Sequence, residues 1–390
     1  MQLKRFNFLR RQIMDKGVAL DSAKRMADWF VNCMSTDMEQ ELLYGTFYYY
    51  VGRDPKRRFR GAQWNQAFAV MGMLSAGKVF GDEKYLDAAG YIIRELKTLQ
   101  EFSPFLPHAY GAIREQTAKT PCCYVRDALS GAWGFLEYYR ATGKEEFLRR
   151  AEMWTEWFLK YGMDETGWPW WAVALDPDDK GLAKWQICND MQGSFQGGCL
   201  NFFYQLYRET GNKKYVGGFF EHIADYFCSH IQQPDGFFRT IARSSGKVPP
   251  QDPQNGHHRG NDDLGSLGLL CAYRIYPKPE YLQAVKKFLT AVFAKQREDG
   301  HFENSCAAIP VVLNTLHEGA GVVDFTVSDS AVQAALQALL LRQYPENEEK
   351  FFAGALNETG EDFACARSTS YALLYLLKLY GGDNRFLTCK

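Results

Sequence analysis

The sequence lacks any apolar run long enough to form a membrane-spanning helix. Its first residues, Met1-Gln2-Leu3-Lys4-Arg5, also lack the apolar core of a signal peptide. We therefore expect no membrane partner. A cytoplasmic location follows, or a periplasmic one if a leader has already been removed.

Motifs for metal, nucleotide and serine-nucleophile chemistry are missing as well. The chain contains neither His-Glu-x-x-His nor Cys-x-x-Cys, which are common zinc-binding patterns. It contains no Gly-x-Gly-x-x-Gly or Gly-Lys-Ser/Thr for phosphate, and no Gly-x-Ser-x-Gly elbow. His301, Cys306 and His317 fall in one predicted loop, without the helical register of a metal site. We expect no metal and no cofactor.

The charge balance and the cysteines exclude two further classes. Lys and Arg number 45 against 46 Asp and Glu, and this balance disfavours nucleic acid as a partner. The ten cysteines show no secreted disulfide spacing. Cys199 and Cys271 lie in apolar helical stretches, which predicts buried free thiols in a reducing compartment.

What the chain does contain is a repeated pair of helices. The clearest copy, residues 126–171, has a Gly- and Ala-rich helix, a turn at Gly143 and an amphipathic helix from Glu145 to Tyr161. Similar turns lie 62, 68, 66 and 68 residues apart, counted along Gly81, Gly143, Gly211, Pro277 and Pro345. The loop that leaves each pair repeats a glycine, at Gly167, Gly236, Gly300 and Gly360. A fixed period of this kind indicates stacked hairpins that share one core.

The repeat predicts an all-α fold, an (α/α)6 barrel or toroid, as one domain over residues 1–390. Small residues let six inner helices crowd around one axis, and the N-terminal helix, near residues 21–34, supplies the sixth outer helix. We expect the inner helices to begin near Asn65, Asp127, Gly193, Asp263, Asp329 and Ser368. All six would point the same way, so their N-termini and the long loops 36–60 and 100–125 meet on one rim.

That predicted rim carries acids and arginines together. Helix N-termini favour negative groups, and aspartate is also a common helix cap. Capping does not require the arginines or the adjacent histidines, so we interpret the set as a substrate site. The expected substrate-binding residues are Trp64, Tyr124, Arg126, Trp170, Gln192, His257, Arg259 and Arg367.

Two carboxylates in an aromatic cleft are typical of glycoside hydrolysis, in which one acid protonates the leaving oxygen and a base or nucleophile acts opposite. We expect Asp127 and Asp263 to fill these roles, with Asp190 and Glu318 in reserve. His258, or its neighbour His257, is a further candidate proton carrier. The aromatic loops suit the apolar faces of sugar rings, although such residues also pack loops onto a barrel.

The arginines predict an anionic substrate, because guanidinium binds carboxylates in a two-pronged way. With acids at inner-helix starts, the ring of hairpins resembles the six-hairpin glycosidases, and among them the uronate-processing unsaturated glucuronyl hydrolases and β-glucuronidases. The resemblance covers nearly the whole chain by architecture. It implies an aspartate at an inner-helix start as acid/base, a place that Asp127 and Asp190 occupy here.

Two other functions stay open at this point. A sugar epimerase or polysaccharide lyase on the same ring would use histidine and tyrosine instead of two acids. A non-catalytic toroid would bind sugars or isoprenoids without turnover. The expected partner of a hydrolase, epimerase or lyase on this ring is an oligosaccharide. The oligomeric state is open, with a homodimer as one option.

Overall fold

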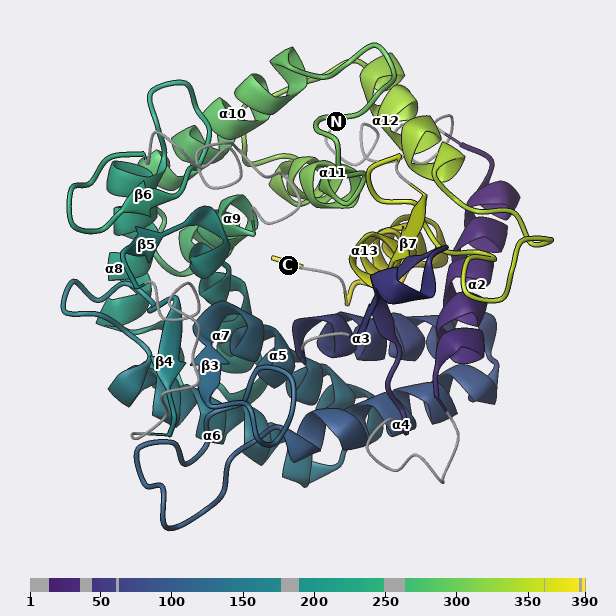
Figure 1. Ribbon diagram of the computed structural model, residues 1–390. Coiled ribbons are helices and arrows are strands. Elements are labelled where there is room, and N and C mark those ends of the chain that lie inside the picture. The colour runs from purple at the N-terminus through teal and green to yellow at the C-terminus, as the bar shows by residue number, and fades with distance from the viewer. Residues whose placement is uncertain are drawn as a thin grey trace.

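The computed structural model describes residues 14–35, 44–60, 63–176, 189–248, 264–360, 362–385 and 388–389. Helices form a double ring in which inner and outer helices alternate along the chain, beginning with an outer helix (Figure 1). The inner helices are α3 (Gln63–Phe80), α5 (Val125–Thr142), α7 (Cys199–Thr210), α9 (Gly265–Ile275), α11 (Ala308–Gly319) and α13 (Ala366–Leu376). The outer helices are α2 (Lys16–Cys33), α4 (Glu83–Thr98), α6 (Glu145–Tyr161), α8 (Gly218–Tyr226), α10 (Pro279–Ala294) and α12 (Asp329–Leu341).

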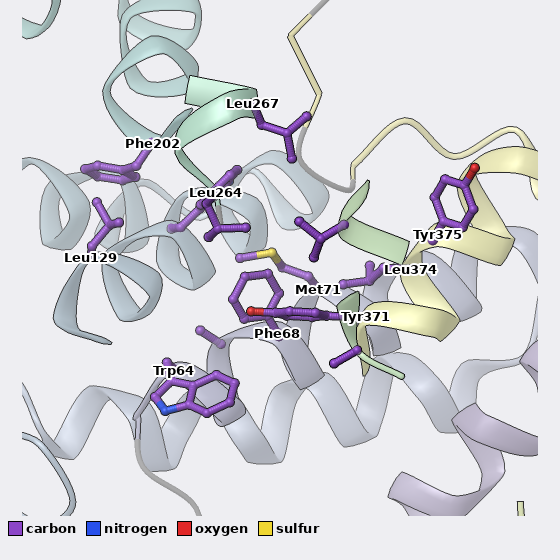
Figure 2. Packing of buried hydrophobic residues seen from close by; sticks show 14 of the residues in the cluster. Trp64, Phe68, Met71, Leu129, Phe202, Leu264, Leu267, Tyr371, Leu374 and Tyr375 are labelled. Atoms are coloured by element: carbon purple, nitrogen blue, oxygen red, sulfur yellow. The ribbon is translucent and has the colours of Figure 1, made fainter. Parts of the chain in front are cut away.

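The predicted (α/α)6 barrel is therefore confirmed. Helix α2 lies beside α13 and α3, so the N-terminal helix closes the ring as expected. The interior is filled by side chains of the inner helices. Figure 2 shows Phe68, Met71, Leu267 and Tyr371 packed there, with Trp64 at one end of the cluster. Ring contacts such as Phe68 with Tyr371, whose centroids are 4.7 Å apart, join the last inner helix to the first.

Short strands cover one rim of the ring. The described strands are β1 (Tyr48–Gly52), β2 (Arg58–Arg60), β3 (Cys122–Tyr124), β4 (Ala172–Ala174), β5 (Met191–Gln192), β6 (Ile241–Ala242) and β7 (Phe363–Cys365). They pair antiparallel as β2-β1-β7, β3-β4 and β5-β6. In the first sheet Tyr50 lies opposite both Phe59 and Cys365, which ties the loop before α3 to the residues before α13.

The prediction was wrong for the fifth inner helix. The helix that begins at Asp329 is outer, and α11 is the inner one, so the predicted loop around His317 is partly helical. Helix α11 is buried on nearly every side and shows no polar stripe, whereas α12 exposes Asp329, Gln333 and Leu341. The small residues of α12 misled the assignment. Consequently the Tyr344-Pro345 copy lies in a loop between hairpins and not in a turn within one.

The repeated glycines hold neighbouring hairpins together. In all six loops that lead from an outer to an inner helix, a glycine with positive φ packs against the following outer helix. These are Gly45, Gly111, Gly167, Gly236, Gly300 and Gly354. The sixth position belongs to Gly354 and not to the expected Gly360, because Gly354 is the residue that approaches Arg25 of α2.

A glutamine completes the contact in four of these loops. Gln296 donates from Nε2 to the Gly300 carbonyl at 3.0 Å and to the Ala331 carbonyl of α12 at 2.9 Å. Gln100, Gln232 and Gln343 make the same double contact. The same pair of glutamine-to-carbonyl hydrogen bonds thus joins neighbouring hairpins at four places around the ring.

Gly300→Ala should lower the free energy of unfolding by about 2–3 kcal/mol, because alanine is strained at φ 87° and its Cβ would meet the Ala334 carbonyl oxygen at 2.3 Å. Gly321→Ala is the matched control. Gly321 has the same φ, 87°, but nothing lies within 4 Å of an added Cβ, so we expect only about 1 kcal/mol. Urea unfolding of both variants measures the difference. Equal losses would mean that the close approach to α12 does not matter.

The end of the ring opposite the strands is closed by a buried ion pair and the C-terminal segment. Lys378, in the π-helical turn Leu377–Gly381, pairs with Glu318 at 2.6 Å, and both side chains are 1% exposed. Glu318 also accepts the Cys389 N–H at 2.8 Å, and Figure 1 shows the C-terminal segment in the middle of the ring. Glu318 lies at the C-terminal end of α11, so it does not belong to the predicted acid site at the N-terminal rim.

Candidate active site

Three adjacent inner helices bring the predicted rim residues together. Trp64 lies in the first turn of α3, Arg126 and Asp127 in the first turn of α5, and Arg367 in the first turn of α13. Helix α3 packs between α5 and α13. Because the N-termini of these helices face the same rim, residues more than 200 positions apart in the sequence become neighbours.

Trp64 is the centre of this group. The guanidinium carbon of Arg126 lies 5.2 Å from the Trp64 ring centroid, and that of Arg367 lies 6.0 Å from it. Both distances fall within the usual reach of cation–π contacts. Both guanidinium groups therefore lie close to the same indole ring.

Each arginine already has a carboxylate partner. Arg126 Nη1 pairs with Asp127 Oδ1 at 2.7 Å, and Arg367 pairs with Glu358. The Glu358 side chain is 4% exposed and also accepts a hydrogen bond from Ser305 Oγ at 2.8 Å. These pairings offset much of the positive charge on which the anionic-substrate prediction rests.

Glu115 stands beside Asp127 and was not predicted. It is 6% exposed, it hydrogen-bonds to Asp127, and its Oε2 accepts from Gln63 Nε2 at 3.0 Å. Gln63 also donates its backbone N–H to the Glu115 carbonyl, so the loop before β3 is fastened to the first turn of α3. We call Glu115 and Asp127 the carboxyl pair.

The carboxyl pair holds a proton. Burial raises the pKa of Glu115 well above its usual range, and the negative charge of Asp127 raises it further. The Gln63 hydrogen bond and the Arg126 charge act in the opposite direction without cancelling the shift. Glu115 is thus favoured as the neutral acid of the pair, and Asp127 also pairs with Arg126.

Glu115→Gln should change how stability depends on pH. Since the pKa of Glu115 is raised in the folded state, the folded wild type binds more protons than the unfolded chain once the pH exceeds the ordinary value of 4.5. Its free energy of unfolding therefore falls as the pH rises through that window. Glutamine cannot titrate, so the stability of Glu115→Gln relative to wild type should increase from about pH 5 to about pH 8. Urea unfolding at both values tests this, and a constant difference would contradict it.

A cleft of about 380 Å³ opens at Trp64, and neither member of the carboxyl pair lines it. Its lining residues are Tyr49, Tyr50, Arg57, Phe59, Trp64, Asn65 and Gln116. The antiparallel β1–β2 hairpin forms an aromatic wall, and Gln116 follows Glu115 directly in the chain. The cleft is connected to the carboxyl pair through Arg126, which lies over Trp64 and pairs with Asp127. Its aromatic wall is suited to a sugar ring.

Tyr124 belongs to the same neighbourhood. Its hydroxyl has no hydrogen-bond partner among the described residues. Burial raises the Tyr124 pKa, and the charges of Glu115 and Asp127 contribute to the increase. Tyr124 is therefore held as a neutral phenol, which can donate a hydrogen bond but is a poor base.

The structure places three other predicted residues in a separate loop cluster. Gln192 is 1% exposed and is engaged by Asp164 and the Tyr226 hydroxyl, at 3.0 and 2.7 Å. Trp170 packs under Arg243, whose guanidinium carbon is 4.9 Å from the ring centroid. Asp190 accepts from the N–H and the hydroxyl of Ser244 at 2.6 and 2.8 Å. These contacts give all three residues a role in shaping loops.

Four predicted residues cannot be placed. Asp263, His257, His258 and Arg259 lie outside the described residues. Their assignment to the site remains a prediction from the sequence.

Sequence reasoning missed Glu115, Glu358 and Asn65 as site residues. Glu115 lies in a long loop whose local pattern does not show what it faces. One signal was present in the sequence: Arg114 and Glu115 come directly after the apolar residues Ala112 and Ile113. The structure buries both of these residues, and Ala109, completely. Charged residues at the end of a buried loop require partners. Arg114 finds them in Glu101 and Asp176, at 2.7 and 3.1 Å.

No group of three or more His, Cys, Asp or Glu side chains among the described residues is arranged as metal ligands would be. None of the described helices has the length and apolar character needed to cross a membrane.

Comparisons with known proteins identify the fold. No family model matches the sequence, and no curated protein matches it either. A sugar epimerase from a ruminal bacterium superposes with a TM-score of 0.69 at 14% identity, covering 94% of this chain and 99% of the other. A family 76 α-mannanase from Bacteroides thetaiotaomicron gives 0.68 at 12% identity, covering 94% and 98%. An inactive α-1,6-mannanase variant from Salegentibacter, with two aspartates replaced and mannotriose bound, gives 0.62 at 12%, covering 94% and 99%.

At these identities the likeness shows the fold alone. The resemblance to six-hairpin glycosidases is confirmed at that level, because glycosidases and epimerases both share this ring. The narrower resemblance to uronate-processing members finds no support among these structures.

Proposed function

We propose that the protein is a glycoside hydrolase that cleaves oligosaccharides in the cleft beside Trp64. The observation that carries this proposal is the carboxyl pair, in which burial raises the pKa of Glu115 next to Asp127. The pair is linked to the aromatic cleft through Gln116, which directly follows Glu115, and through Arg126 on Trp64. An acid with a raised pKa is what protonation of a glycosidic oxygen requires. The mannotriose bound to the structurally similar mannanase supports a carbohydrate ligand on this ring.

The carboxyl pair acts as one unit in this proposal. Acid and base in glycosidases are about 5–5.5 Å or about 6.5–9.5 Å apart, and two hydrogen-bonded carboxyls are closer than either range. Glu115 therefore gives its proton to the leaving glycosidic oxygen and becomes a carboxylate, and the water that adds to the sugar carbon supplies the proton that restores it. A second carboxylate has to stand opposite. Glu358, which pairs with Arg367 near Trp64, is one candidate, and Asp263 is the candidate from the sequence.

The uronate preference remains a prediction. Arg126 and Arg367 both pair with carboxylates already, and Arg57 also lines the cleft. Paired p-nitrophenyl glucuronide and glucoside substrates test it. A uronate enzyme should prefer the glucuronide by at least about tenfold in kcat/KM, the effect of one charge-assisted contact.

Sugar epimerisation is the second candidate, favoured by the superposition on a ruminal sugar epimerase. It needs a base at the cleft. Among the described residues no histidine lines the cleft, so His257 and His258 would have to supply one. A non-catalytic sugar-binding ring is the remaining alternative.

A product analysis separates these functions. The full chain is incubated with aryl glycosides, α-1,6-mannobiose, cellobiose and an unsaturated uronyl disaccharide, and the products are followed by NMR. Hydrolysis should release free reducing sugar in stoichiometric amount. A change of C2 configuration without chain cleavage would replace the proposal with epimerisation. Binding without any turnover would leave a lectin-like role.

A further inference from the structure

Asn65 is a buried polar side chain that has no hydrogen bond among the described residues. It is 2% exposed, and neither its Oδ1 nor its Nδ2 finds a partner there. Leaving a buried donor and a buried acceptor unmade is unfavourable, so such groups in folded proteins normally have a partner. Asn65 lies in the first turn of α3, and its side chain lines the cleft beside Trp64. The missing partner can therefore come from the cleft.

The wall above Asn65 indicates the shape of that partner. Phe59 is 56% exposed although it is a large apolar side chain. Tyr50 stacks on Phe363 with centroids 3.9 Å apart, which keeps the β1–β2 wall in place, and Tyr49 packs edge-on against Trp64 at 5.4 Å. Flat aromatic faces of this kind bind the apolar face of a pyranose ring.

We propose that Asn65 is a specificity-determining residue that binds two adjacent hydroxyls of a pyranose ring seated against the β1–β2 wall. A carboxamide presents one acceptor and one donor side by side. Neighbouring ring hydroxyls offer the complementary donor and acceptor, so a single asparagine satisfies both. This inference rests on the proposed function for its ligand class and deepens it, because it assigns recognition to vicinal hydroxyls and not to a carboxylate.

The test combines Asn65 variants with deoxy sugars. The best p-nitrophenyl pyranoside from the product analysis is compared with its 2-, 3- and 4-deoxy analogues. In the wild type, removing a hydroxyl that Asn65 binds should lower kcat/KM by about 10- to 100-fold. Asn65→Ala should cause a similar loss on the parent sugar but little further loss on that analogue, because the contact is already gone. Asn65→Asp, which keeps the acceptor, should recover part of the activity.

Gln66→Ala is the matched control. Gln66 lies in the same turn, is 4% exposed and also has an oxygen without a partner, but it does not line the cleft. We expect less than about a threefold change for it, together with no selective loss on any deoxy analogue.

Failure of this inference differs from failure of the proposed function. If the protein cleaves nothing, calorimetric titration with methyl α-mannopyranoside and methyl β-glucopyranoside still tests Asn65, and a Kd that rises about tenfold in Asn65→Ala supports the site. If cleavage occurs but Asn65→Ala lowers kcat/KM equally on parent and deoxy sugars, Asn65 is a structural residue and the inference is wrong. Binding of adenosine in preference to every pyranoside would also overturn it, since asparagine can pair with adenine in the same two-pronged way.

Discussion

Asp127→Asn should lower kcat by about 10²- to 10⁴-fold, with a much smaller change in KM. The substitution keeps the shape of the side chain but removes the charge that pairs with Arg126 and accepts the hydrogen bond of Glu115. An amide cannot exchange a proton with a carboxyl, so the carboxyl pair no longer cycles between its two protonation states. Steady-state kinetics on the best substrate measures the effect.

Asp329→Asn is the matched control for Asp127→Asn. Asp329 also stands in the first turn of a helix and was expected on the same rim. The structure places it on the outer helix α12, where its side chain is exposed. We expect less than about a twofold change in kcat. Asp263→Asn tests the second carboxylate expected from the sequence, and Glu358→Gln tests the alternative from the structure. Wild-type activity in Asp127→Asn would remove the proposed mechanism.

Lys378→Met should lower the free energy of unfolding by about 3–5 kcal/mol, because it leaves Glu318 charged and almost fully buried. Lys378 Nζ donates to Asn314 Oδ1 at 2.7 Å as well as pairing with Glu318 at 2.6 Å. The loss should reach the C-terminal segment, since Glu318 also holds the Cys389 N–H. Urea unfolding measures the loss of stability, and proteolysis measures how far the C-terminal segment is released.

A double substitution distinguishes loss of the pair from a buried unpaired charge. Lys378→Met with Glu318→Gln removes both charges and keeps an acceptor for Cys389, so more than half of the lost stability should return. Lys286→Met is the exposed control, because Lys286 pairs with Asp324 at the same 2.6 Å but the two side chains are 46% and 96% exposed. We expect less than about 1 kcal/mol there. A double variant as unstable as Lys378→Met would contradict the explanation.

Local pattern was sufficient for most helices. The bounds of α6 agree with the sequence prediction, α3 and α5 begin within two residues of theirs, and α2 within five. A polar face marks α2 and α6, and the turn residues of the repeat help to place the others. The error at α11 arises because this helix lacks a polar face. A helix surrounded by protein has no polar stripe, so its periodicity gives little information about its place in the ring.

The candidate site was predictable only where it lies on helix starts. Trp64, Arg126, Asp127 and Arg367 follow the repeat, and the structure does bring them together. Glu115, Glu358 and Asn65 do not share a local pattern. Glu115 and Glu358 matter because they are buried beside Asp127 and Arg367. Asn65 matters because it is buried without a hydrogen-bond partner among the described residues.

The sequence by itself determined the ring of hairpins, since the hairpin repeat and small residues are local properties that each copy carries. Only the tertiary structure decided which acid keeps its proton and which arginines are already neutralised. Those properties depend on burial and on charges brought within a few ångströms from distant parts of the chain, such as Glu115 beside Asp127 and Glu358 beside Arg367.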